Sequence, residues 1–187
     1  MKLILASTSP RRRELLTTLD VPFDVVPPTF VETNSERSAA EETLYFAEQK
    51  ARSIAAEYSN ALILGSDTLI ACGGEKLGKP RDPADAHRIL SYLSGRIHEL
   101  YTAVALLNTA SQQCRHHLEI VRVRFRALSE AEIAQYIATG EPMGKAGAYA
   151  AQEKGQHLIE YIEGDRNAVI GLPLDPIKAW LTEYGIL

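Results

Sequence analysis

The chain has 187 residues, of which 45% are hydrophobic and 24% charged, so it can bury a core within one domain, residues 1–187, that has room for two lobes. Its net charge of −4 argues against a general electrostatic attraction to nucleic acid or to an anionic membrane, so we expect neither as a partner. Cys72 and Cys114 are far apart and form no zinc or disulfide pattern, and no apolar stretch approaches the roughly 20 residues of a transmembrane helix, so we expect a cytoplasmic protein.

The first predicted elements are a strand, a tight turn and a helix. Residues 3–6 form an apolar run typical of a buried strand, and Ser9-Pro10 predicts a helix start with a capping hydroxyl. Residues 11–13 are all arginine, in a first turn where acidic side chains are usually favoured. This arrangement is typical of α/β proteins that bind phosphate, and the arginines would add bidentate contacts. The alternative is a solvated basic helix end paired with Glu14.

A second strand over residues 21–26 and an amphipathic helix follow. The helix is indicated by apolar residues at steps of three and four from Ala40 to Ile54, and Glu32 lies in the loop before it. Lys50 lies at the edge of the apolar stripe, from where its ammonium could reach a cleft. The alternative is a lysine that extends from the margin of the core into water.

The next strand, residues 61–71, is the most apolar so far, yet Asp67 interrupts it. A carboxylate in a buried strand is unfavourable unless it is paired or binds a metal, which makes Asp67 a functional candidate, with a hydrogen-bonded structural role as the alternative. Gly73-Gly74 predicts a hairpin that returns the chain toward this strand. Lys79 follows between glycine and proline, either as a positioned cation or as an exposed turn residue.

The second half of the chain predicts mostly scaffold. We expect helices that begin at Asp82-Pro83, at the capping box of Ser129 and near Pro173. We expect strands over residues 98–107, 118–127 and 158–162. In the second of these, arginines alternate with apolar residues, which favours a solvated sheet face over a nucleic-acid surface.

Residues 143–152 are rich in glycine and alanine, and we interpret them as too small-sided to build a core. Such a segment lets the backbone come close to a ligand. Its chemical groups are the charge of Lys145, the ring of Tyr149 for stacking and the amide of Gln152 for a base edge. The alternative is a loop whose polar residues are incidental.

Together, these candidates form an inventory suited to a polyphosphate and a metal. The cations are Arg11, Arg12, Lys50 and Lys79, and the carboxylates are Glu32 and Asp67, all near the ends of apolar strands. Several cations would hold phosphates, and carboxylates with phosphate oxygens suit magnesium. The common nucleotide-binding and hydrolase motifs are absent from the sequence.

Seven motifs, in order along the chain, resemble the Maf family of nucleoside triphosphate pyrophosphatases. They are Leu5–Leu16, Gln49–Ala51, Gly65–Thr68, Gly78–Asp82, Leu93–Gly95 with His98, Lys145–Gln152 and Val169–Leu174. The resemblance implies a two-lobed α/β fold with a mixed sheet and flanking helices, similar to inosine triphosphate pyrophosphatase. It also implies a divalent cation, Mg²⁺ or Mn²⁺, and cleavage of a nucleoside triphosphate to the monophosphate and pyrophosphate.

The resemblance also implies roles for individual residues. Asp67 would be the proton acceptor that activates a water for attack on the α-phosphorus, with a metal shared between Asp67 and Glu32. The triphosphate would be bound by Arg11, Arg12, Lys50 and Lys79. The branch that acts on dTTP and UTP is marked by an arginine, a threonine and a glutamine, which here are Arg11, Thr68 and Gln152. In the branch that acts on 7-methyl-GTP, tryptophan, glutamine and glutamate stand at those places.

The substrates implied are therefore dTTP, UTP and modified pyrimidine nucleotides that share the same edge. The alternative is a non-catalytic nucleotide-binding regulator of cell division and septum formation, with which the family is also associated. A carboxylate beside a polyanion weighs against a pure binding protein, because it repels the ligand unless metal or water is engaged. A homodimer is consistent with general frequency, although no interface is legible in the sequence.

Overall fold

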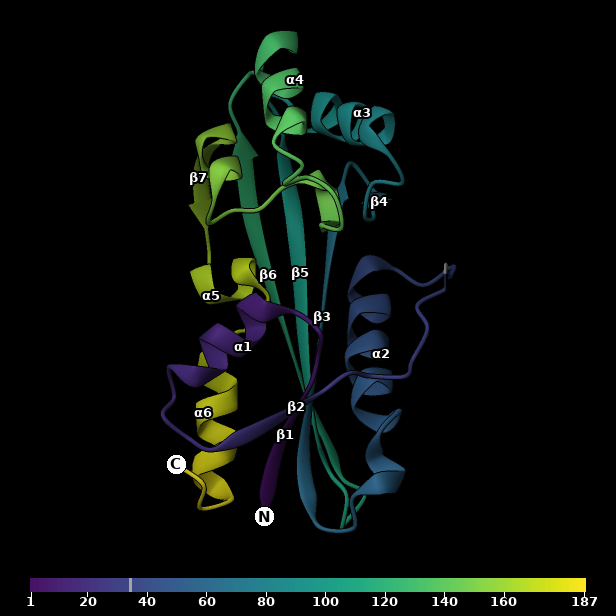
Figure 1. Cartoon of the computed structure of the whole chain (residues 1–187), viewed down its shortest axis with the longest axis vertical. Helices are drawn as coiled ribbons and strands as arrows, with labels where there is room; N and C mark the ends of the chain where they lie inside the picture. The colour runs from purple at the N-terminus through teal and green to yellow at the C-terminus, as the bar shows by residue number, and fades with distance from the viewer. Residues whose placement is uncertain (34) are drawn as a thin grey trace. The chain divides into compact units, whose positions relative to one another are not determined.

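A seven-stranded mixed sheet flanked by helices forms the framework of the computed structural model, which describes residues 1–33 and 35–187 (Figure 1). The predicted α/β class is confirmed. The chain divides into two compact units. Unit 1 comprises Met1–Asp67, Thr102–Glu119 and Gly171–Leu187, and unit 2 comprises Thr68–Tyr101 and Ile120–Ile170. Three long strands contribute residues to both units: β3 (Ala61–Cys72), β5 (Ile97–Asn108) and β6 (Cys114–Phe125).

Unit 1 is built around parallel strands. Its further elements are β1 (Lys2–Ala6), α1 (Pro10–Thr17), β2 (Phe23–Val26), α2 (Ala39–Arg52), the short 3₁₀ turn η1 (Ala55–Glu57) and α6 (Leu174–Glu183). Strand β1 pairs in parallel with both β2 and β3, and the strand order across this part of the sheet is β2-β1-β3-β5-β6. The predicted strands and helices of this region are confirmed.

Helices cover both faces of the unit 1 sheet, because β1 and the start of β3 are apolar on both sides. Leu3 and Leu5 belong to the cluster that includes α1 and α6, whereas Ile4 and Ala6 belong to the cluster that includes α2. This alternation follows from the two-residue period of a strand. Figure 1 shows α1 and α6 on one side of β1 and α2 on the other.

Helix α1 begins at Pro10 as predicted, but the predicted capping hydroxyl of Ser9 is wrong. Ser9 occupies the N-cap position, but its side chain makes no capping hydrogen bond. Instead, the backbone N–H of Ser9 donates to the hydroxyl oxygen of Ser7, at 3.1 Å. A hydroxyl two residues upstream therefore fixes the turn, which is a common local bond for serine.

Unit 2 is built around antiparallel strands. Its own elements are β4 (Glu75–Leu77), α3 (Pro83–Leu93), α4 (Glu130–Ala138), the 3₁₀ turns η2 (Ala146–Ala148) and η3 (Lys154–Leu158), β7 (Ile159–Glu163) and α5 (Arg166–Ile170). Strand β4 pairs antiparallel with β3 through the predicted hairpin, and β7 pairs antiparallel with β6. Asp82 caps α3, and Ser129 forms the predicted capping box of α4.

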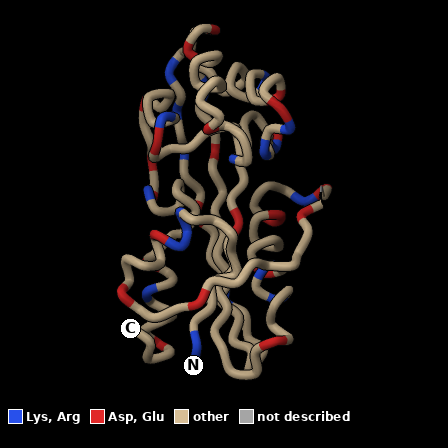
Figure 2. Tube along the Cα trace, in the orientation of Figure 1, with Lys and Arg blue, Asp and Glu red and all other residues tan. Residues whose placement is uncertain are grey.

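The solvated arginine face predicted for β6 is confirmed. Val121, Val123 and Phe125 are fully buried, while the alternating arginines form ion pairs with glutamates on β7 and α4. Figure 2 shows acidic and basic residues intermingled along this part of the trace. In the described part of the chain, the helices lack the length and the apolar character that a membrane-spanning helix needs.

The prediction that residues 143–152 are too small-sided to build a core is wrong. Tyr149 is only 5% exposed and belongs to the main hydrophobic cluster of unit 2, together with Ala148. Its hydroxyl and Nε2 of His98 are hydrogen-bonded at 2.8 Å, and its ring packs edge-on against Phe125. Tyr149 therefore anchors this segment to the core and is not a ring available for stacking on a ligand.

Candidate active site

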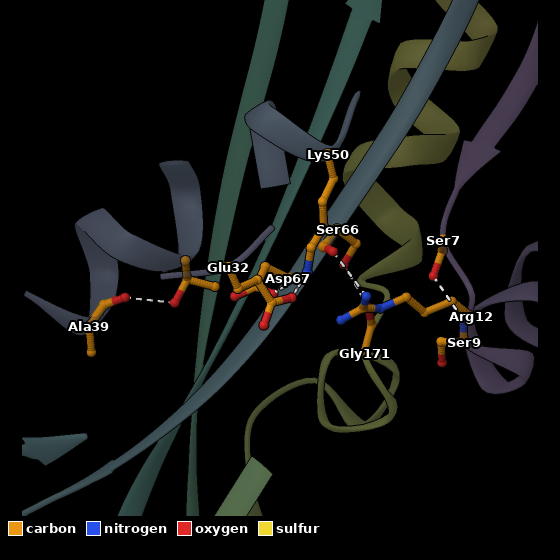
Figure 3. A network of polar contacts seen from close by, with 10 residues as sticks. Ser7, Ser9, Arg12, Glu32, Ala39, Lys50, Ser66, Asp67 and Gly171 are labelled. Carbon is orange, nitrogen blue, oxygen red and sulfur yellow. Dashed lines mark hydrogen bonds and ion pairs between the residues drawn. The ribbon is translucent and has the colours of Figure 1, made fainter. Parts of the chain in front are cut away.

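Arg12 connects three segments of unit 1. Its side chain extends from the first turn of α1 and donates from Nε to the carbonyl oxygen of Gly171 and from Nη1 to that of Ser66, each at 2.9 Å (Figure 3). The hydroxyl of Ser66 donates to the same Gly171 carbonyl, also at 2.9 Å. The guanidinium is thus fixed between the α1 turn, strand β3 and the segment that leads into α6.

Three charged side chains act on the guanidinium of Arg12. Burial lowers the pKa of Arg12, the negative charges of Asp67 and Glu32 act in the opposite direction, and the nearby charge of Arg11 lowers it further. An arginine keeps its charge in proteins under all ordinary conditions. Arg12, with Arg11 beside it, therefore lies in the same electrostatic environment as both predicted carboxylates.

Lys50 joins the two predicted carboxylates directly. Its Nζ lies 2.6 Å from Oδ1 of Asp67 and 2.6 Å from Oε1 of Glu32 (Figure 3). The two carboxylate oxygens are therefore separated by no more than twice that distance. The side chains of Lys50 and Asp67 are each only 9% exposed, whereas that of Glu32 is 38% exposed. Lys50 is thus a buried ion-pair partner, and the alternative of a lysine that extends into water does not describe it.

The close approach of α2 to β3 makes this ion pair reachable. Gly65 lies in β3 two residues before Asp67, and a Cβ at that position would lie 2.1 Å from the carbonyl oxygen of Ala47 in α2. Only a residue without a side chain allows the helix backbone to come so near. Lys50, less than one turn further along α2, therefore reaches the strand that carries Asp67.

The loop that carries Glu32 is held against α2 by the residues just before it. Phe30 packs against Phe46, with ring centroids 5.4 Å apart. The backbone N–H of Thr29 donates to the hydroxyl oxygen of Ser53 at 3.1 Å, and the Thr29 hydroxyl donates to the Ser53 carbonyl at 3.0 Å. These contacts bring Glu32, from a loop, to the same Lys50 ammonium that Asp67 contacts from a buried strand.

The donor set of Glu32 and Asp67 fits a hard divalent cation. Both carboxylates already converge on one positive centre, the Lys50 ammonium, and their combined charge exceeds that of the lysine. Carboxylate oxygens are the ligands that Mg²⁺ and Mn²⁺ prefer in proteins.

The remaining predicted residues lie in unit 2. Thr68 follows Asp67 in β3 and is partly buried, Lys79 is exposed between β4 and α3, and Gln152 is exposed after η2. The backbone N–H of Gly147 donates to the Gly78 carbonyl at 3.1 Å, which ties the segment before Gln152 to the residue before Lys79. The structure therefore brings together Arg11, Arg12, Glu32, Lys50 and Asp67 in unit 1, and it links the surroundings of Lys79 and Gln152 within unit 2.

A family model described as Maf-like protein matches residues 2–184. The chain belongs to the Maf family. Three relatives named dTTP/UTP pyrophosphatase match over nearly their whole length. They are a Moorella thermoacetica protein that is 45% identical over 99% of this chain and 96% of its own, a Dictyoglomus thermophilum protein that is 43% identical over 98% and 96%, and a Myxococcus xanthus protein that is 45% identical over 98% and 93%.

Sequence reasoning missed two groups that fix the site of this Maf protein. The carbonyl of Gly171 accepts hydrogen bonds from Arg12 and from Ser66, and Ser66 itself offers a carbonyl to Arg12. Both residues lie inside motifs that resemble the family, but a backbone acceptor carries no side-chain signal in a sequence. The only available sign is that Gly171 is followed by leucine and proline just before a helix.

Proposed function

We propose that this Maf protein is a nucleoside triphosphate pyrophosphatase that hydrolyses dTTP and UTP to the nucleoside monophosphate and pyrophosphate. The observation that carries the proposal is the buried ion pair of Lys50 and Asp67, shared with Glu32 and placed near the fixed guanidinium of Arg12. The names of the relatives, all dTTP/UTP pyrophosphatase, support the same reaction. Because the substrates are soluble nucleotides, the proposal includes action in the cytoplasm.

In the proposed reaction, Asp67 accepts a proton from a water that attacks the α-phosphorus. The new bond joins the water oxygen to the α-phosphorus, and the bond from the α-phosphorus to the oxygen that bridges to the β-phosphorus breaks. The pyrophosphate leaves, and the proton passes from Asp67 to solvent. The ion pair with Lys50 holds the Asp67 carboxylate in one orientation, which is what a proton acceptor requires.

A divalent cation held by Glu32 and Asp67 would supply positive charge to the phosphate oxygens and help to lower the pKa of a bound water. The chain's own cations supply the rest. Arg11, Arg12, Lys50 and Lys79 would stabilise the negative charge that develops on the leaving pyrophosphate. Because Arg12 is already fixed by the carbonyls of Ser66 and Gly171, its charge needs little reorganisation during the reaction.

We assign base selection to Arg11, Thr68 and Gln152, the residues that mark the branch acting on dTTP and UTP. The amide of Gln152 both donates and accepts hydrogen bonds, which suits the edge of a pyrimidine. Modified pyrimidine nucleotides that keep this edge are included in the proposed substrate class, and purine triphosphates should be poor substrates.

The test is pyrophosphate release from dTTP, UTP, 7-methyl-GTP and ATP, each with and without Mg²⁺. We expect turnover of the two pyrimidine nucleotides that depends on the cation. Asp67→Asn should lower it by about 100-fold or more, while Asp175→Asn, an exposed aspartate in the first turn of α6, should leave it unchanged. Unchanged turnover by Asp67→Asn, or a preference for 7-methyl-GTP, would contradict the proposal. Tight dTTP binding with no pyrophosphate release would favour the regulator instead.

A further inference from the structure

Unit 1 holds a group of side chains of the types that bind metals, made of different residues from the carboxylates of the candidate active site. It consists of Glu48 on α2 and of Cys114 and His116 on β6, and we call it the Glu48–Cys114–His116 cluster. One oxygen, one sulfur and one nitrogen atom from these residues all lie within 4.8 Å of one another. We propose that this cluster binds a transition-metal dication of the zinc class.

The backbone places all three side chains on one side of the sheet. Cys114 and His116 are two residues apart in a strand, so they face the same way. Cys114 packs beside the cluster that contains Ala47, the α2 residue immediately before Glu48. A helix and a strand that are packed together thus supply the donors, which is a firmer support than a loop.

A neighbouring arginine fixes the carboxylate of the cluster. Oε1 of Glu48 accepts a hydrogen bond from Nε of Arg52 at 2.6 Å, while Oε2 lies 2.7 Å from Nε2 of His116. One oxygen is therefore held by Arg52 and the other is directed toward the imidazole. Partners that orient a ligand in this way are typical of metal sites and contribute to their affinity.

The chemistry of the donors selects the cation. A carboxylate, a thiolate and a neutral imidazole carry two negative charges together, which matches a dication. Sulfur and nitrogen ligands favour Zn²⁺ and Co²⁺ over Mg²⁺, and three protein ligands leave a fourth position for water. Burial, together with the charge of Glu48, raises the pKa of Cys114 to about 11, so binding would displace the thiol proton to solvent.

The alternative is a plain ion pair between Glu48 and His116 that happens to lie beside a thiol. Cobalt separates the two, because a charge-transfer absorption between sulfur and Co²⁺ arises only where a thiolate is bound. The carboxylates Glu32 and Asp67 cannot produce it. The chain has only two cysteines, so the sulfur can be identified by substitution.

The experiment is a titration of the purified protein with Co²⁺, followed by displacement with Zn²⁺. We expect one charge-transfer band that Zn²⁺ removes, loss of the band in Cys114→Ser, and at least tenfold weaker binding in His116→Gln. Cys72→Ser is the matched thiol control, and His117→Gln is the matched imidazole control, because His117 pairs with Glu119 instead. Both controls should keep the band.

Zn²⁺ should also raise the unfolding temperature of the wild-type protein more than that of His116→Gln, which gives a second measurement if Cys114→Ser folds poorly. Absence of the band in the wild-type protein, or a band that survives Cys114→Ser, would overturn the proposal. Neither measurement depends on pyrophosphatase activity, so failure here and failure of the proposed function are distinguishable.

Discussion

In a Lys50→Met variant, an apolar chain of similar length replaces the ammonium that joins Glu32 and Asp67. The Asp67 side chain is only 9% exposed, so water cannot replace the lost partner. Removal of one member of a buried ion pair typically destabilises a protein by about 3–5 kcal/mol, because the other charge is left buried. Glu32 is 38% exposed, and its share should be less than about 1 kcal/mol since solvent screens it. Methionine and lysine have similar helix propensities, so α2 itself should not change the balance.

The free energy of unfolding, measured in urea, reports this loss. We expect it to fall by about 3–5 kcal/mol in Lys50→Met. Asp67→Asn removes the uncompensated charge, so the double variant should be more stable than additivity predicts by at least about 2 kcal/mol. Lys178→Met, an exposed lysine on α6, is the matched control and should stay within about 0.5 kcal/mol of the wild type. A loss below about 1 kcal/mol for Lys50→Met, or simple additivity with Asp67→Asn, would refute the reasoning.

Three further predictions follow from the same structure. Gly65→Ala should destabilise the protein by about 3 kcal/mol or more, because its Cβ would meet the α2 backbone, whereas Gly78→Ala, with nothing within 4 Å, should stay within about 0.5 kcal/mol in the same urea assay. Burial lowers the pKa of His98 to about 4 from 6.5. Between pH 6.5 and about 4 the unfolded state binds a proton on this imidazole that the folded state does not, so the free energy of unfolding should fall as the pH decreases through that window. The slope of the free energy of unfolding against pH should approach about 1.4 kcal/mol per pH unit, and urea titrations of His98→Gln should lack this contribution to the slope. Arg12→Lys cannot span the carbonyls of both Ser66 and Gly171, so pyrophosphate release should fall by about tenfold or more even though the charge is kept; a wild-type rate would contradict a positioning role for the guanidinium.

Patterns of apolar residues and caps predicted most of the framework, because they report directly on burial. Residues 3–6 of β1 and 61–64 of β3, which pair in parallel, are continuous apolar runs, and α3 and α4 begin at an aspartate and a serine that cap them. Asp67 and Lys50 stood out for the same reason, since each places a charge in or beside a buried stripe. The short helix α5 was not predicted, because five residues after a glycine carry too little periodicity to separate them from a loop.

Contacts between segments that are far apart in the chain could not be predicted from the sequence. Nothing near Tyr149 indicates that its hydroxyl is paired with His98 on β5, so small neighbours suggested an open loop. The run Ser7-Thr8-Ser9 offers several hydroxyls to one turn, and only the fold decides which of them accepts the bond. The same holds for Glu48, whose proximity to Cys114 and His116 depends on how α2 packs against β6.

Hydrolysis of dTTP in water enriched with ¹⁸O tests most directly whether the water attacks the α-phosphorus. Mass spectrometry of the two products locates the heavy oxygen. The proposed reaction predicts one ¹⁸O atom in the thymidine monophosphate and none in the pyrophosphate. Heavy oxygen in the pyrophosphate, or release of inorganic phosphate as the first product, would contradict it.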